Sequence, residues 1–360
     1  MIKPEKREEN LNLEPSGTTL CKASGIFRVL RSHKKGIEIV ENVILRTENL
    51  KKYFPVKKTL LRRHVHWIKA LDGVDLELRE GQILGVVGES GSGKTTLAKT
   101  ILGIYQPSEG TVFFKGDLIS HLSPKRMKSI RREIQYVYQN PGASFDPWWK
   151  VERSLGEPLK IHENLSNPEI EKRVKGVVKS VGLEQDHIFR YPHEFSGGQQ
   201  RRLALARILV LNPSLIIFDE PTSGLDVSIQ ATILKLLKKL RNDLGLTYIF
   251  ISHDLEVVRM MSNQIAVMYL GAVVEHGSTE KVFMDPKHPY TQLLLAAAPK
   301  IERPPLEEDV LIQGTVPDPA HIPSGCRFWP RCPAPFEICK TEIPLLKPID
   351  NSQKVSCHKY

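Results

Sequence analysis

The chain has 360 residues, of which 41% are hydrophobic and 26% are charged, as in an ordinary folded protein. It has no apolar run near the roughly 18 residues that a membrane-spanning helix needs, and Met1–Asn12 is too charged for a secretory signal. The net charge of +10 is spread along the chain, which favours a basic solvated surface over a nucleic-acid footprint. We therefore expect a cytosolic protein that reaches a membrane only through partners.

Residues 1–42 are polar and lack sustained periodicity, which predicts a mobile N-terminal extension. From Val43 onward, short apolar runs alternate with helical patterns, as expected of an α/β fold around a mostly parallel sheet. Early segments such as Val74–Leu78 are expected at an antiparallel β edge, and Gln82–Val87 is expected as a buried strand. We expect this domain to cover 43–285, with a helical subdomain at about 140–205.

A glycine-rich segment, GESGSGKT at Gly88–Thr95, follows that buried strand and precedes a helical pattern. It fits G-x-x-x-x-G-K-[ST], in which backbone N–H groups and a helix N-terminus surround nucleotide phosphates. Lys94 would bridge the β- and γ-phosphates, and the Thr95 hydroxyl would bind Mg²⁺. The predicted ATP contacts in this segment are Gly88, Ser90, Gly91, Gly93, Lys94, Thr95 and Thr96.

Two acidic residues, Asp219 and Glu220, follow the apolar strand Leu215–Phe218. A carboxylate at the end of a buried strand suits a magnesium ligand, here Asp219. The neighbouring Glu220 suits the group that polarises the attacking water. These features predict a nucleotide hydrolase but leave kinases, GTPases, helicases and transport ATPases open.

A second anion-binding turn, FSGGQQ at Phe195–Gln200, precedes another helical pattern. It resembles the LSGGQ signature of the ABC ATPase family and departs from it only at Phe195. Two phosphate sites on one chain imply head-to-tail pairing, with each ATP held between the loop of one subunit and the signature of the other. The residues expected to contact ATP across the pair are Ser196, Gly197, Gly198 and Gln199.

Further family landmarks occur in order within about Ile44–His276. Gln139 resembles the Q-loop glutamine, Asp226 the D-loop aspartate at the dimer interface, and His253 the switch histidine that contacts the γ-phosphate. Phe54 is expected to stack on adenine, with Tyr53 as the alternative. The resemblance implies an ATPase with catalytic residues Glu220, His253 and Gln139 and magnesium ligands Thr95, Gln139 and Asp219.

Two features resemble the oligopeptide/dipeptide/nickel importer branch of that family: the extended Q-loop up to Pro147, and a proline-rich tail containing the sequence GCRF at Gly325–Phe328. The tail predicts a C-terminal extension over 286–360. Its cysteines are spaced C-x5-C-x6-C-x17-C, which matches no standard zinc pattern and suits an iron–sulfur cluster. We predict a [4Fe–4S] cluster that holds together a module with little core, with Zn²⁺ or unligated thiols as alternatives. The expected ligands are Cys326, Cys332, Cys339 and Cys357.

The resemblance implies the ATP-hydrolysing subunit of an ABC importer at the cytoplasmic face of the plasma membrane. Peptides are the expected cargo, with nickel or oligosaccharides as alternatives. Its partners would be two permease subunits, a second ATPase subunit that is different or identical, and, indirectly, an extracellular binding protein. Exposed Phe145, Trp148 and Trp149 are expected to form a socket for a permease. A soluble ABC ATPase acting on nucleic acid or ribosomes is the alternative; a single cassette without heptads disfavours it, so no nucleic acid is expected.

Overall fold

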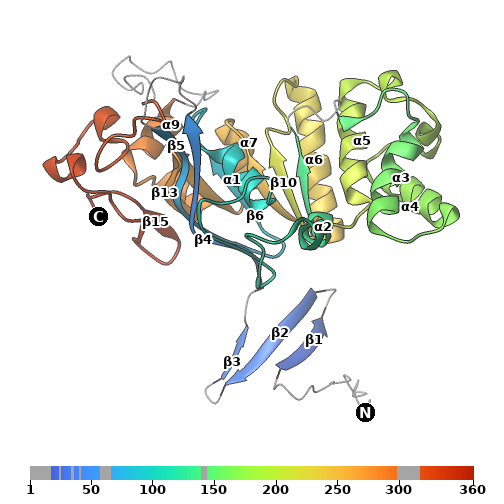
Figure 1. Cartoon of the computed structure of the whole chain (residues 1–360), viewed down its shortest axis with the longest axis horizontal. Coiled ribbons are helices and arrows are strands. Elements are labelled where there is room, and N and C mark those ends of the chain that lie inside the picture. The colour runs from blue at the N-terminus through green and yellow to red at the C-terminus, as the bar shows by residue number, and fades with distance from the viewer. Residues whose placement is uncertain are drawn as a thin grey trace, which may run out of the picture.

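The computed structural model describes residues 18–23, 26–33, 36–39, 42–56, 66–138, 144–297 and 317–360. Within these residues, an eight-stranded sheet and a four-stranded sheet form the body of the molecule, and helices α3, α4 and α5 gather at one end of it (Figure 1). The C-terminus lies toward the opposite end (Figure 1). The predicted α/β fold with an antiparallel edge and a helical part is confirmed.

The larger sheet has the strand order β14-β15-β13-β12-β6-β11-β10-β9. Strands β9, β10, β11, β6 and β12 run parallel, whereas β13, β14 and β15 add antiparallel partners at one edge. Every residue of β6, β10 and β11 is buried, which explains their continuous apolar runs. The strands are β6 (Ile83–Val87), β9 (Ile134–Val137), β10 (Leu215–Asp219), β11 (Thr247–Ile251), β12 (Gln264–Tyr269), β13 (Ala272–Ser278), β14 (Lys347–Pro348) and β15 (Gln353–Val355).

The smaller sheet is antiparallel, with the strand order β5-β4-β7-β8. Helix α1 (Lys94–Ile101) lies between the two sheets, because Leu97 and Ile101 share one core cluster with Leu84 of β6 and Leu45 of β4. This packing fixes the start of α1 at the end of β6. The strands are β4 (Val43–Val56), β5 (His66–Arg79), β7 (Glu109–Phe114) and β8 (Asp117–Leu118).

The helical part is built on apolar faces with helical spacing, such as Val174 and Val178 of α4 and Leu155 and Leu159 of α3. Its elements are α3 (Val151–His162), α4 (Asn167–Ser180), α5 (Gly197–Leu209) and the short turns η2 (Gln185–Phe189) and η3 (Pro192–Glu194). The remaining helices are α2 (Pro124–Glu133), α6 (Val227–Leu244), α7 (Leu255–Met261), α8 (Thr279–Met284) and α9 (Pro289–Ala296).

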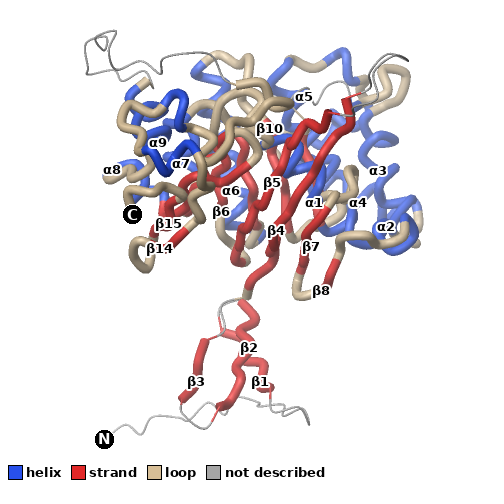
Figure 2. Tube along the Cα trace, turned by 60° about the vertical axis from the view of Figure 1, so that its left-hand side comes forward, coloured by secondary structure: helices blue, strands red, loops and turns tan. Residues whose placement is uncertain are grey.

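Three strands near the N-terminus form an antiparallel sheet of their own (Figure 2). They are β1 (Thr18–Ala23), β2 (Ile26–His33) and β3 (Gly36–Ile39). The sequence predicted a mobile extension over 1–42 and did not indicate these strands. They are short and joined by two-residue connections, so the window over which a pattern can be read is small.

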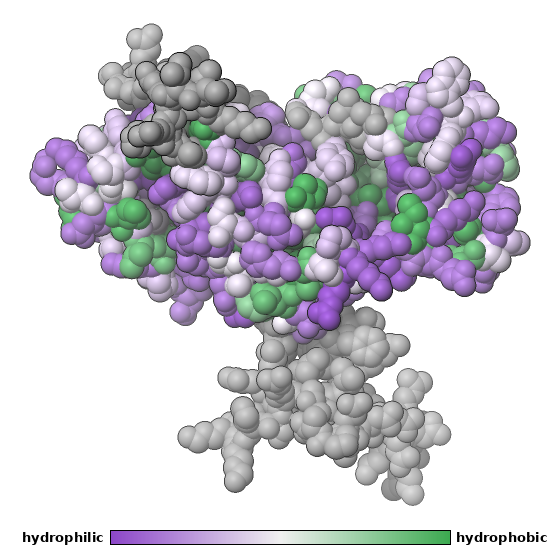
Figure 3. All heavy atoms as spheres, in the orientation of Figure 1, coloured by the Kyte–Doolittle hydropathy of each residue, from purple (hydrophilic) through white to green (hydrophobic). Residues whose placement is uncertain are grey.

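The C-terminal segment 317–360 is mostly irregular, with short turns η5 (Trp329–Arg331) and η6 (Glu337–Lys340). It does not stand apart from the body: β15 pairs with β13, and the Phe328 side chain is only 1% exposed. Among the described residues, no helix is long and apolar enough to span a bilayer. The face drawn in Figure 3 is mostly hydrophilic, with hydrophobic residues in small groups.

Candidate functional site

The predicted phosphate loop forms a tight turn between β6 and α1. Gly88 and Gly93 have φ values of 147° and 103°, and a Cβ on either would collide with the carbonyl oxygen of Met268 or Ala70, respectively. Only glycine fits at both positions. The Lys94 ammonium lies inside the turn, where it donates to Gly88 O at 2.7 Å and to Glu89 O at 2.9 Å. The loop is thus wrapped around the lysine that is predicted to meet the phosphates.

The electrostatic setting of Lys94 suits an anion. Its side chain is buried at 9% exposure, and burial lowers the pKa of the ammonium. The negative charges of Glu220, Asp219 and Glu89 act in the opposite direction. Lys94 therefore faces the two carboxylates that the sequence analysis assigned to magnesium and water. Thr95, at the start of α1, is exposed, and Thr96 is half-buried.

Asp219 and Glu220 lie at the carboxyl end of β10, next to the end of β11. Asp219 is 7% exposed and accepts a hydrogen bond from the Tyr136 hydroxyl at 2.6 Å. Glu220 has a positive φ of 55°, an uncommon conformation for a non-glycine residue that is typical of functional sites. Its Oε2 lies 2.7 Å from Nδ1 of His253, which is exposed. Because parallel strands end at one edge, residues distant in sequence meet there.

The donors present fit Mg²⁺, which prefers hard oxygen ligands and uses few protein groups when phosphates complete its shell. Asp219 supplies a carboxylate from the strand end, and Thr95 supplies an exposed hydroxyl. Gln139, the third predicted ligand, lies outside the described residues.

The predicted signature begins α5 in the helical part. Ser196 caps the helix: its Oγ accepts from Gln199 N at 3.4 Å, and Gln199 Oε1 accepts from Ser196 N at 3.0 Å. Phe195, the departure from the family pattern, is 6% exposed and packs edge-on against His187. The departure therefore falls on a core position and leaves the exposed Ser196 and the first turn of α5 unchanged.

Arg201 links this helix to the predicted D-loop, a contact that the sequence analysis missed. Its guanidinium donates to Pro221 O at 2.9 Å and Ser223 O at 2.8 Å. Asp226 caps α6 by accepting from Ile229 N at 2.9 Å. A hollow beside the signature is lined by Ser196, Gly198, Gln199 and residues of α6, and none of the described residues that line it belongs to the phosphate loop. Within one chain the two predicted phosphate sites are therefore separate.

The two candidate adenine partners on β4 differ in their surroundings. Phe54 is half-buried; its ring packs edge-on against Tyr105 and lies 5.0 Å from the Lys52 ammonium. Tyr53 donates its hydroxyl to Asp72, a contact that, with burial, raises its pKa. Tyr53 is thus engaged in a polar contact, whereas Phe54 has an aromatic and cationic environment.

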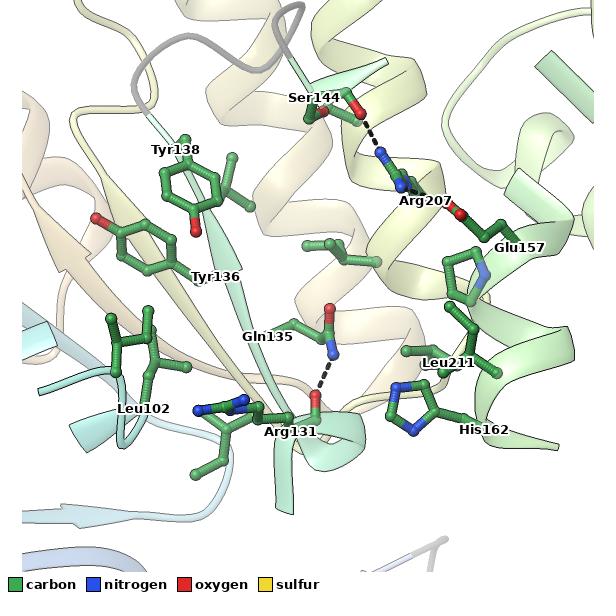
Figure 4. Close-up of a pocket in the computed structure, with 17 residues that line it drawn as sticks. Leu102, Arg131, Gln135, Tyr136, Tyr138, Ser144, Glu157, His162, Arg207 and Leu211 are labelled. Carbon is green, nitrogen blue, oxygen red and sulfur yellow. Dashed lines mark hydrogen bonds and ion pairs between the residues drawn. The ribbon is translucent and has the colours of Figure 1, made fainter. Parts of the chain in front are cut away.

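A groove lies between β9 and helices α3 and α5 (Figure 4), with a volume of about 430 Å³. Tyr136 and Tyr138 line one side of it, and His162 lines another (Figure 4). Arg207 closes one end: it donates to Ser144 O and pairs with Glu157 at 2.8 Å. Trp148 is 86% exposed, but Phe145 is only 6% exposed. The prediction that Phe145 belongs to an exposed aromatic socket is therefore wrong.

The prediction of an iron–sulfur cluster is wrong. Among the residues that the structure describes, no group of three or more His, Cys, Asp or Glu side chains could hold a metal ion, which also removes the zinc alternative. The four C-terminal cysteines are free, and burial raises the pKa of Cys326 to about 11 and the pKa values of Cys332 and Cys357.

The error came from treating the extension as a module with its own small core. Phe328 packs against Tyr269 of β12 and Tyr290 of α9, with ring centroids 5.3 and 5.4 Å away. Arg327 pairs with Asp72 at 2.6 Å, and Arg331 pairs with Glu89 at 2.8 Å. The extension is thus held by docking onto the body, and no sequence pattern signalled these contacts.

Comparisons with known proteins agree with this geometry. A family model described as "ABC transporter" matches residues 71–223, and one described as "Oligopeptide/dipeptide transporter, C-terminal region" matches residues 274–339. The oligopeptide transport ATP-binding protein AppF of Bacillus subtilis is 44% identical over 89% of this chain and 98% of its own length. The dipeptide transport ATP-binding protein DppF of Escherichia coli is 43% identical over 88% of this chain and 95% of its own length. Neither name describes an iron–sulfur protein.

Solved structures agree as well. The ATP-binding cassette MJ0796, in a dimeric post-hydrolysis state bound to ADP and Pi, aligns with a TM-score of 0.58 at 30% identity, covering 66% of this chain and 99% of that one. The CbiO1 protein of Clostridium perfringens, part of an ABC transporter complex, aligns with a TM-score of 0.59 at 31% identity, covering 68% and 92%.

Proposed function

The chain belongs to the ATP-binding subunits of oligopeptide and dipeptide ABC transporters, and we propose that Lys94, Thr95, Asp219, Glu220 and His253 form the site at which it hydrolyses ATP. The observation that carries this assignment is the meeting of the phosphate loop, two carboxylates and a histidine at one edge of the parallel sheet. The soluble alternative, acting on nucleic acid or ribosomes, finds no support among the relatives.

In this proposal the loop and Lys94 bind the phosphates, and Glu220 takes up the proton as water attacks. His253 orients the Glu220 carboxylate through the 2.7 Å contact, and its 68% exposure leaves it accessible to a phosphate oxygen. Mg²⁺, held by Asp219 and Thr95, would supply charge neutralisation when bound. The remaining predicted ATP contacts, including Phe54, belong to the same proposal, as does Gln139 as a catalytic residue and magnesium ligand.

The site is completed by a second cassette. Ser196, Gly197, Gly198 and Gln199 lie at the start of α5, and all but Gly197 line a hollow separate from the phosphate loop. Head-to-tail pairing of two cassettes would bring this helix N-terminus onto the phosphates of the partner's ATP. Either a second copy of this chain or a related ATPase could supply that surface. Arg201 would couple the position of the signature helix to that of the D-loop when two cassettes pair, because it joins the signature helix to Ser223 of the D-loop.

We further propose that the groove beside β9 receives a cytoplasmic segment of a permease. It lies where the helical part meets the sheet that carries the ATP site, so a segment bound there contacts both. Trp148, four residues along the chain from Ser144 of the groove, offers an exposed aromatic side chain, of the kind that anchors interfaces. In this proposal the chain works at the cytoplasmic face of the membrane, in a transporter for peptides. Residues 43–285 form the ATPase domain and residues 286–360 form its extension.

The test compares three variants in the assembled transporter. Glu220→Gln should bind MgATP but lose steady-state hydrolysis by roughly 10²–10⁴-fold, the contribution of a positioned general base. Lys94→Ala should instead weaken nucleotide binding. Glu171→Gln makes the same chemical change on the outer face of α4, where its side chain is 52% exposed, and should leave turnover unchanged. Near-normal hydrolysis by Glu220→Gln would remove Glu220 from its role.

A further inference from the structure

The second residue of the phosphate loop, Glu89, is held by two residues from beyond position 285. Arg331 makes a bidentate pair with its carboxylate, with Nη1 2.8 Å from Oε2 and Nη2 2.9 Å from Oε1. The backbone N–H of Glu89 donates to the Tyr290 hydroxyl at 2.9 Å. Both the side chain and the main chain of this loop residue are therefore fixed by the C-terminal part of the chain.

These contacts are partly shielded from solvent. The Arg331 side chain is 5% exposed and the Glu89 side chain 24%, and Tyr290 is fully buried. Arg331 also donates to the Tyr269 hydroxyl at 3.2 Å. A planar guanidinium with two parallel hydrogen bonds has a defined orientation, which a surface ion pair lacks.

The charge of Glu89 matters for a nucleotide. Glu89 is next to Lys94 within the loop, because the Lys94 ammonium donates to the Glu89 carbonyl oxygen at 2.9 Å. Phosphates bound at Lys94 would therefore lie within the field of the Glu89 carboxylate, which repels them in a poorly screened site. Arg331 pairs with this carboxylate, and its positive charge offsets the negative charge of Glu89.

We propose that Arg331 is a positioning residue of the ATP site, through which the C-terminal extension sets the nucleotide affinity of the phosphate loop. The proposal rests on the assignment of the ATP site to Lys94. The extension would then take part in nucleotide binding, because any change in its docking alters the net charge next to the phosphates.

The experiment measures MgATP binding to the purified full chain by calorimetry. Arg331→Met leaves the Glu89 carboxylate unpaired, and its affinity for MgATP should fall about tenfold, the consequence of about 1.4 kcal/mol. Adding Glu89→Gln to this variant removes the unpaired charge and should restore affinity to within about threefold of the unmodified chain.

Arg327→Met is the matched control. It removes the other buried arginine of the extension, whose partner is Asp72, and Glu89→Gln should not rescue any loss that it causes. If Arg331→Met does not fold, Arg331→Lys should show a smaller loss that Glu89→Gln again reverses. An Arg331→Met affinity within twofold of the original, or a loss that Glu89→Gln leaves in place, overturns the proposal. If Lys94→Ala binds MgATP normally, the ATP-site assignment itself fails, whereas failure of the Arg331 variants alone leaves it standing.

Discussion

Replacing Phe328 with alanine measures how strongly the C-terminal extension is held by packing. The ring is 1% exposed and lies against Tyr269, Tyr290 and His288, with centroid distances of 5.3, 5.4 and 5.7 Å. Truncating a buried phenylalanine costs about 3–5 kcal/mol, more when the surroundings cannot collapse into the space. Since Tyr269 and Tyr290 are themselves held by hydrogen bonds to Arg331 and Glu89, we expect a loss near 4 kcal/mol. Undocking of the extension would then become about a thousand times more frequent.

Limited proteolysis under native conditions measures this directly, because cleavage of a transiently open segment follows the population of the open form. Cleavage within 317–360 should accelerate strongly in Phe328→Ala. The control is Phe336→Ala in the same extension, whose ring is 48% exposed and whose loss should stay below about 1 kcal/mol. Equal protection in the two variants would show that packing at Phe328 does not hold the extension.

Two further predictions concern the permease surface and pH. Replacing Trp148 and Trp149 with alanine should reduce transport and permease-stimulated ATPase activity without changing MgATP binding. Trp67 is exposed as well, and Trp67→Ala should leave transport unchanged. Unaltered transport in the Trp148 and Trp149 variant would mean that the permease binds elsewhere. Burial lowers the pKa of His276 to about 4 and of His288 to about 3, below the usual 6.5. As the pH falls below 6.5, these histidines become protonated in the unfolded chain before they do in the folded chain. The free energy of unfolding therefore decreases on acidification toward pH 3, by roughly 1 kcal/mol per histidine at pH 5.5. Urea unfolding of a His276→Gln, His288→Asn variant should show a shallower pH dependence, and an unchanged slope would contradict the assignment.

The residues proposed for the ATP site could be selected from the sequence because their chemistry constrains short segments. A loop that surrounds phosphates needs glycines at fixed spacing, and the structure shows that Gly88 and Gly93 cannot carry a side chain. The carboxylates and His253 were found because polar residues after buried strands must share one sheet edge. Here the spacing of residues in the sequence and the order of strands in the sheet both indicate the same site.

Burial of individual aromatic residues was less predictable. Phe145 and Trp148 are three positions apart in one irregular segment, yet the first is 6% exposed and the second 86%. Without helical or strand periodicity, sequence gives no face to assign them to. The pairing of Arg331 with Glu89 joins residues 242 positions apart, so no local sequence pattern could indicate it.

The seating of Phe328 and the pairing of Arg331 are consequently one thermodynamic system. If the docked extension raises the affinity of the phosphate loop for MgATP, then bound MgATP must stabilise the docked extension by the same factor, because linkage is reciprocal. If the extension did not affect the loop, docking and nucleotide affinity would be independent, and Arg327 and Arg331 would only hold the extension in place. Protection of 317–360 from proteolysis should therefore increase with MgATP in the unmodified chain and should not increase in Arg331→Met, where the link between the extension and the loop is cut.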